Sequence, residues 1–378
     1  MKKIITATLM SASLVSSAAV YAVQEAALIS VQEICARDAI ECSRTDAGIV
    51  VGRPGTTNPY ADGLNAAAKR FERFFGRTAP KAAVVLGEIE DADIRTSLLE
   101  AYPVVLPWLT IKDREAMVAS GVRAQVRQQY PDMDEATFEA VVARSVQASL
   151  NASSGAGYEG GGAAADVHQG VYAHELGHLF FIRTFWPEEN MNVVNTRPED
   201  VMRYAGPGPD WLDEMAAVLM ENQALTEGRE TGLITLANED DFSGLWPLND
   251  YFGMTHPAFE QARAIIEARQ NTAEGRAKGN VVILQRGQLD TRADGRDSAM
   301  FYSQSRGFAD YLIEKTGNEQ IFTDIATHIA AGASMESWLR EFGVGYGLQV
   351  SVQALEADFH HWLEGRYGGM SDPSHGHS

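Results

Sequence analysis

Two histidines near the middle of the chain have the type and spacing of metal ligands. The segment Val171–Phe181 reads Val-Tyr-Ala-His-Glu-Leu-Gly-His-Leu-Phe-Phe and matches the pattern His-Glu-x-x-His. His174 and His178 are four positions apart, so in a helix both imidazoles project from the same face, one turn apart. One tetrahedral Zn²⁺ can accept a nitrogen from each ring. The sequence therefore predicts that these two histidines hold zinc.

Glu175 follows the first histidine and is suited to a different task. A helix turns by about 100° per residue, which places this carboxylate beside the metal rather than on it. There it can accept the proton of a metal-bound water. The surrounding residues are mainly Val, Ala, Leu, Phe and Ile, which indicates a buried helix whose polar groups need partners. His168 precedes His174 by six residues and faces another side of this helix, so it is not part of the predicted site.

The third ligand is predicted in a second helix. The segment Pro209–Ala217 begins with Pro-Asp, and these residues suit the first turn of a helix and its positive end. Glu214 is followed by small residues, which let this helix approach the first one closely. Asp213 and Asp210 are weaker alternatives on other faces of the same helix.

The two motifs together resemble the gluzincin, or peptidase MA-like, superfamily of zinc metallopeptidases. The resemblance rests on the His-Glu-x-x-His motif at His174–His178 and on a Trp-Leu-x-Glu-x-x-Ala motif at Trp211–Ala217. It implies that Glu214 is the third zinc ligand and that the substrate is a peptide or protein. The chain departs from the family in two ways. Thirty-five residues separate His178 from Glu214, a longer gap than in thermolysin, and Met215 replaces the usual glycine.

A downstream segment extends this resemblance. Phe301–Leu312 with the following Glu-Lys-Thr-Gly is similar to a helix that comes after the metal-binding helices in the family. Tyr302 near its start is a candidate catalytic residue, because its hydroxyl can donate to the oxyanion that forms when a peptide carbonyl is hydrated. A packing role for Tyr302 stays open, and Tyr251 and His256 are alternative donors.

The elements that must position these residues indicate an α+β fold. The N-terminal half alternates helical and strand patterns. These are Gly63–Phe75 (helix), Lys81–Gly87 (buried strand), Tyr102–Ile111 (strand), Lys112–Gln129 (helix) and Asp134–Leu150 (helix). Pro103 and Pro107 place the second strand at an edge or a bend. A Gly/Ser-rich loop, Asn151–Gly162, then leads into a mainly helical, gluzincin-like half. We predict a zinc site in the cleft between the two halves.

The N-terminus predicts export. Lys2 and Lys3 precede a small-residue apolar stretch, and Val-Tyr-Ala ending at Ala22 fits a cleavage site. We therefore expect a signal peptide over 1–22, an α+β region over 23–162, a helical zinc-site region over 163–370 and a disordered tail over 371–378. The mature protein would be periplasmic or secreted, without a stable membrane anchor, because Ser and Thr interrupt the apolar stretch.

Only two cysteines are present, Cys35 and Cys42. An oxidising compartment favours a disulfide between them. One continuous helix would separate them by about 10 Å of rise, so the bond requires a turn in the chain. Two buried free thiols are the alternative.

Composition limits the classes of function. The chain has 378 residues, of which 45% are hydrophobic and 22% charged, as in ordinary globular proteins. A net charge of −20 argues against nucleic acid as a partner, since no basic face balances the acidic residues. We expect an exported zinc metallopeptidase. A zinc amidase with a non-protein substrate and a non-catalytic zinc-containing module are the alternatives, and the sequence does not predict the oligomeric state.

Overall fold

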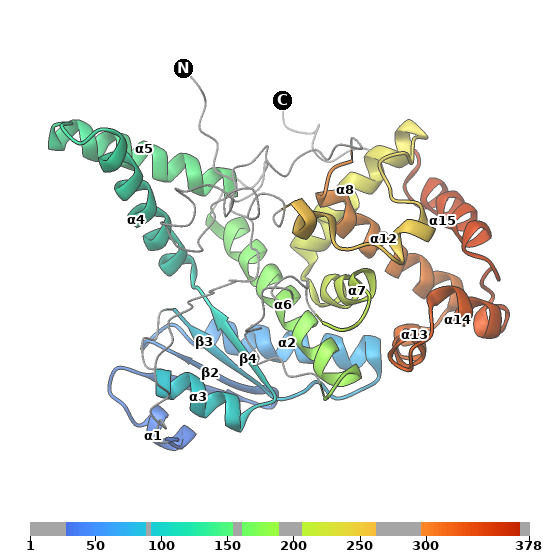
Figure 1. The fold of residues 1–378 in the computed structure, drawn as a ribbon, viewed down its shortest axis with the longest axis horizontal. Coiled ribbons are helices and arrows are strands. Elements are labelled where there is room, and N and C mark those ends of the chain that lie inside the picture. Colours follow the sequence, from blue (N-terminus) through green and yellow to red (C-terminus); the bar gives the residue numbers. More distant parts are fainter. Residues whose placement is uncertain (1–27, 88–91, 154–160, 189–205, 262–295, 371–378) are drawn as a thin grey trace, which may run out of the picture.

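The computed structural model describes residues 28–87, 92–153, 161–188, 206–261 and 296–370 (Figure 1). Within these ranges the protein is a mixed α+β structure with one small sheet and a mostly helical remainder. This confirms the predicted α+β class. The predicted signal peptide (1–22) and C-terminal tail (371–378) lie outside the described residues. None of the described helices is both long and apolar enough to cross a membrane.

The sheet has four strands in the order β1-β2-β3-β4. They are β1 (Glu41–Thr45), β2 (Gly48–Gly52), β3 (Ala82–Leu86) and β4 (Val104–Trp108). The first two strands form an antiparallel hairpin, and the other two add in parallel. At the hairpin turn Gly48 has φ +148°, and a Cβ there would lie 1.8 Å from the carbonyl oxygen of Ala82. Only glycine lets β2 start this close to β3.

β3 and β4 lie where the sequence predicts strands. β4 pairs only with β3 in the described sheet, so it is an edge strand, as Pro103 just before it and Pro107 within it indicate. Pro107 lies opposite Val85 and has no N–H to donate. β1 and β2 are additional strands that the pattern did not predict.

Alternate residues of the strands enter two different cores. Val50, Val84 and Leu106 belong to a large hydrophobic cluster on one face. Ile49, Val51 and Ala83 belong to a small cluster on the other face. Helix α2 (Asn58–Phe75) contributes to the large cluster, whereas α1 (Val31–Cys35) and α3 (Ala92–Ala101) cover the small one. The buried residues of α2 include Phe71, Phe74 and Phe75, the apolar side that the sequence predicts.

The two cysteines form a disulfide. Cys35 ends α1, the chain turns, and Cys42 lies in β1, so the turn that the spacing requires is present. The bond ties α1 to the edge of the sheet.

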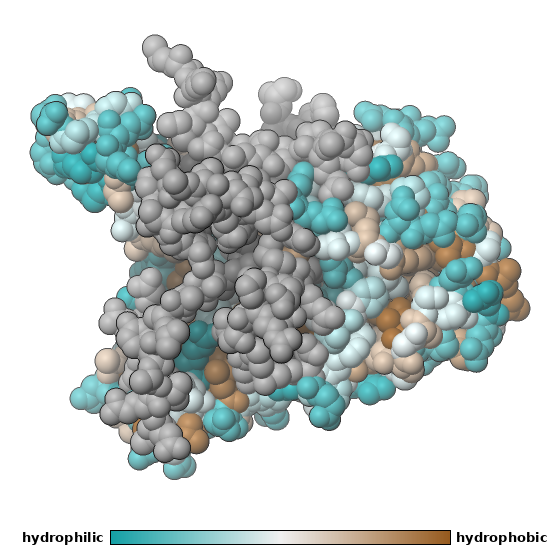
Figure 2. All heavy atoms as spheres, in the orientation of Figure 1, coloured by the Kyte–Doolittle hydropathy of each residue, from teal (hydrophilic) through white to brown (hydrophobic). Residues whose placement is uncertain are grey.

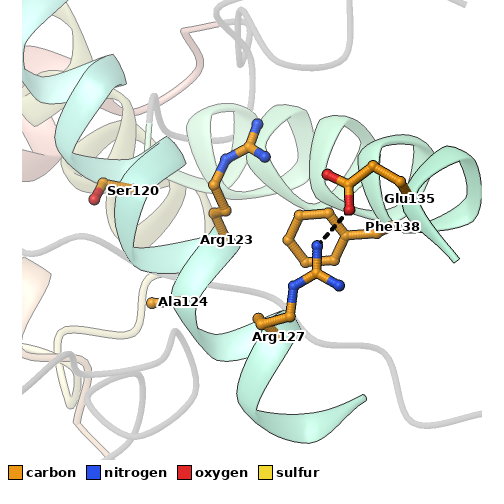
Figure 3. Close-up of a pocket in the computed structure, with 6 residues that line it drawn as sticks. All are labelled: Ser120, Arg123, Ala124, Arg127, Glu135 and Phe138. Carbon is orange, nitrogen blue, oxygen red and sulfur yellow. Dashed lines mark hydrogen bonds and ion pairs between the residues drawn. The ribbon is translucent and has the colours of Figure 1, made fainter. Parts of the chain in front are cut away.

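Helices α4 (Ile111–Gln129) and α5 (Glu135–Ser153) form a hairpin that projects from the body of the molecule (Figure 1). Val126, Phe138 and Val142 make a separate small core between them. Arg127 lies over the ring of Phe138, 3.7 Å from its centroid, and pairs with Glu135 (Figure 3). The far end of the hairpin is predominantly hydrophilic (Figure 2). The hairpin is therefore stabilised by contacts between its own two helices rather than by packing on the sheet.

The remaining described helices pack around the large cluster. They are α6 (Gly161–Phe185), α7 (Asp210–Met220), α8 (Gln223–Glu239), α9 (Leu248–Tyr251), α12 (Ala299–Thr316), α13 (Ile321–Ala330), α14 (Met335–Phe342), the 3₁₀ helix η1 (Gly343–Tyr346) and α15 (Val352–Tyr367). Of the predicted loop Asn151–Gly162, the first three residues are helical in α5 and the last two in α6. Residues 154–160 lie outside the described residues. The large cluster is continuous from the sheet to α15, so α6 and α7 cross the centre of the protein.

Candidate metal centre

The site begins with the close packing of α6 against α7. A Cβ on Gly177 would lie 2.8 Å from the Cα of Ala217 and 3.1 Å from the carbonyl oxygen of Ala216. Two helices can approach this closely only where both carry small residues at the contact. The prediction that small residues after Glu214 permit close approach is thus confirmed.

The three predicted ligands come together at this contact. One ligand atom from each of His174, His178 and Glu214 lies within 4.8 Å of the others, and all three side chains are buried. Nε2 of His174 is 3.3 Å from Oε1 of Glu214, and Nε2 of His178 is 3.9 Å from Oε2. A set of two imidazole nitrogens and one carboxylate oxygen suits zinc and other divalent transition metals. The residues present therefore fit a metal ion.

The other ring nitrogens are held by two further carboxylates. Nδ1 of His174 is hydrogen-bonded to Oε1 of Glu221 at 2.9 Å, and Nδ1 of His178 is 3.1 Å from Oδ1 of Asp213. An ionised carboxylate only accepts, so each Nδ1 carries the hydrogen. Each Nε2 faces Glu214 and is the nitrogen that a bound metal would take. A metal bound there would require the neutral tautomer with its hydrogen on Nδ1, and the carboxylates behind the rings favour that tautomer.

The two alternative ligands are used elsewhere. Asp213 lies behind His178 rather than among the three ligand atoms. Oδ2 of Asp210 accepts the backbone N–H of His256 at 2.7 Å and so anchors a loop. Of the acidic residues in this segment, Glu214 is the one placed to bind a metal.

The site has a strongly negative field. Burial by itself lowers the pKa of His178, but the carboxylates of Asp213 and Glu214 outweigh it and raise the pKa to about 10. The same carboxylates would stabilise a bound cation. The charge of the site thus favours a divalent metal as much as its geometry does.

Glu221 was not identified from the sequence. It is fully buried just after α7 and accepts from Arg229, with Nη2 at 2.8 Å from Oε1 and Nε at 3.3 Å from Oε2. Burial opposes its ionisation, but Arg229 and His174 lower its pKa to about 2. Glu221 follows Glu214 by seven residues, or two helical turns. That spacing is a signal that could have placed it on the same side of α7.

Glu175 lies beside the ligands and is partly exposed. Among the described residues none is hydrogen-bonded to its carboxylate. Burial raises its pKa, which the nearby histidines partly oppose. Glu175 is not one of the three residues whose ligand atoms come together, and its role beside a metal stays a prediction.

Tyr302 and His256 lie on the α12 side of the site. The Tyr302 ring centroid is 6.0 Å from that of His174 and 5.0 Å from that of His256. His256 is buried, with Nε2 3.5 Å from Oε2 of Glu214. The third candidate donor, Tyr251, has its hydroxyl 2.7 Å from Oγ of Ser305 inside the core. Tyr302 and His256 are therefore close to the predicted ligands, and Tyr251 is committed to packing.

His168 belongs to a different cluster. Its Nε2 accepts from Nε1 of Trp108 at 3.0 Å and lies 3.1 Å from the hydroxyl of Tyr60. Burial, assisted by the charge of Arg114, lowers its pKa to about 4. It is a neutral histidine that joins α6 to the end of β4, separate from the three ligands.

Comparison of the chain with family models, with curated proteins and with solved structures finds no match. The resemblance to gluzincins thus depends on the two motifs and on the residues that surround them.

Proposed function

We propose that the chain is an exported zinc-dependent metallopeptidase of the gluzincin type, which hydrolyses peptide bonds in a peptide or protein substrate. The observation that carries this proposal is the arrangement of His174 and His178. Both Nε2 atoms face Glu214, both Nδ1 atoms are held by carboxylates, and Glu175 stands free beside them. A gluzincin-like cleft between the two halves of the chain is part of the same proposal.

The metal is proposed to be zinc, held by His174, His178 and Glu214. Three protein ligands leave a coordination position open, as in catalytic rather than structural zinc sites. Bound there, zinc would supply a Lewis acid that polarises the scissile carbonyl and lowers the pKa of water towards about 7.

The protein's own residues would do the rest of the chemistry. Glu175 takes the proton from the attacking water and passes it to the leaving amine. The Tyr302 hydroxyl donates to the carbonyl oxygen as that oxygen gains negative charge. Glu221 and Asp213 hold the two imidazoles in their tautomer and orientation.

Two other functions were left open by the sequence. A zinc amidase would use the same residues, so only its substrate distinguishes it. A purely structural zinc site needs no base, and the partly exposed Glu175 argues against that function. Among the described residues, the cluster supplies three ligands rather than the four of a closed site.

The test combines metal analysis with a peptide-library digest. We expect about one Zn²⁺ per chain and cleavage by the wild-type protein. Glu175→Gln should keep the metal and lose turnover by several orders of magnitude, because an amide cannot accept the proton. A wild-type protein without metal rejects the zinc proposal, and a zinc-loaded protein that cleaves amides but no peptide supports the amidase. A mature N-terminus at Val23 on protein outside the cytoplasm tests export.

A further inference from the structure

Arg229 touches two separate parts of the candidate site. On one side its guanidinium makes two hydrogen bonds to the Glu221 carboxylate, which in turn holds Nδ1 of His174. On another side the same group lies over the Tyr302 ring, with its carbon 4.6 Å from the centroid. A metal ligand on α6 and the candidate oxyanion donor on α12 are thus connected through one arginine of α8.

The burial of Glu221 shows why Arg229 matters to metal binding by His174, which is called the metal side below. Glu221 is fully buried, and a buried carboxylate that loses one of its partners is strongly destabilised. Arg229 allows Glu221 to stay beside His174 as an ionised acceptor. Without that partner the carboxylate has to turn towards water, and Nδ1 of His174 loses the bond that orients its ring.

The planar shape of the guanidinium matters to the orientation of Tyr302, which is called the tyrosine side below. Stacking a planar cation on an aromatic face restricts the tilt of the ring, and a lysine ammonium cannot reproduce this geometry. In Tyr302 a change of ring tilt moves the hydroxyl at its far end. The hydroxyl's direction therefore depends on the same side chain that holds Glu221.

We propose that Arg229 is a positioning residue that orients His174 through Glu221 and orients the Tyr302 hydroxyl through its ring. Arg229 would then affect metal affinity through Glu221 and turnover through Tyr302. This inference rests on the proposed zinc peptidase function.

The metal side is tested by measuring Zn²⁺ affinity in competition with a chelator, a readout that needs no activity. Arg229→Met should weaken zinc binding by about 10- to 100-fold, as for other residues that hold zinc-bound histidines. Arg306→Met is the matched control. Arg306 is similarly buried (15% exposed against 21%) and is ion-paired to Asp310. We expect the zinc affinity of Arg306→Met to equal that of the wild type.

The link to Tyr302 is tested with Arg229→Lys, which keeps a positive charge near Glu221 but loses the planar guanidinium over the Tyr302 ring. Zinc affinity should stay within about threefold of wild type, while kcat falls about tenfold with KM little changed, a part of the loss that removal of an oxyanion donor causes. In a Tyr302→Phe background the same change should have no further effect on kcat, because the hydroxyl is already absent.

The outcomes separate the inference from the function on which it rests. A wild-type chain that binds no zinc overturns both. Zinc binding by wild type with equal affinities in Arg229→Met and Arg306→Met overturns the metal side of the inference alone. Additive effects of Arg229→Lys and Tyr302→Phe on kcat overturn the tyrosine side. If Arg229→Met does not fold, a zinc affinity of Arg229→Gln equal to that of Arg306→Met is the contradicting result.

Discussion

Replacing Gly177 with alanine tests whether the contact between α6 and α7 sets the geometry of the metal centre. In an exposed helix this change should help, because alanine is favoured over glycine by about 1 kcal/mol. Here the new methyl carbon would lie 2.8 Å from the Cα of Ala217, and ordinary contact starts at 3.4 Å. The backbone of α7 cannot rotate away as a side chain can, so the helices must separate.

The size of the effect follows from that separation. The helices have to move apart by about 0.6 Å, the difference between the two contact distances. Overpacking of this kind costs about 1 to 3 kcal/mol, which offsets or exceeds the gain in helix propensity. Zinc–ligand distances tolerate only about 0.2 Å. His174 and His178 are on α6 and Glu214 is on α7, so we expect zinc affinity to fall at least tenfold.

The assay compares three proteins by urea unfolding and by chelator competition for Zn²⁺. Gly121→Ala is the control, because Gly121 lies in α4 with no atom within 4 Å of an added Cβ. That variant should gain about 1 kcal/mol and keep the zinc affinity of wild type. If Gly177→Ala gained as much stability with zinc affinity unchanged, the close contact would not position the ligands, and the reasoning would be refuted.

Three further predictions concern single side chains. Glu214→Gln should weaken zinc binding, measured by metal analysis; full zinc content would return Asp213 to consideration as the third ligand. Tyr302→Phe should lower kcat by about a hundredfold with zinc content and KM nearly unchanged, and an unchanged kcat would leave it a packing residue. His168 has its pKa lowered from 6.5 to about 4, so the unfolded chain binds its proton first and stability falls as the pH drops from 6.5 towards 4. The loss approaches about 3 kcal/mol; urea unfolding of chelator-treated protein should show it, and His168→Gln should lack that part of the slope.

The grouping of His174, His178 and Glu214 was predictable in part, because the histidine motif is local. The four-residue spacing of His174 and His178 fixes their common face as soon as the segment is helical. Glu214 needed the resemblance to a family, since nothing in the spacing alone separates it from Asp213. The structure separates them by geometry, with one carboxylate in front of the imidazoles and the other behind.

The supporting residues were not predictable in the same way. Arg229 is placed by the packing of α8 against α12, and His256 reaches the site from a short loop after α9. Neither has a motif. The hairpin of β1 and β2 was not predicted from the sequence for another reason. β1 reads Glu-Cys-Ser-Arg-Thr and is only partly buried, so it lacks the apolar alternation of an ordinary strand.

The continuous core has a consequence for the order of events during synthesis. α2 packs against α13, which is made much later. The ring of Phe75 contacts that of Phe322, and the Thr323 hydroxyl donates to the carbonyl oxygen of Phe75 across 248 residues. At about 5 to 20 residues per second, a ribosome needs roughly 10 to 50 s to supply these partners. For that time the phenylalanines of α2 have no complete core to enter. A nascent chain of this protein therefore emerges with an amphipathic helix whose apolar face chaperones can bind, and this part of the core can be completed only after α13 has been made.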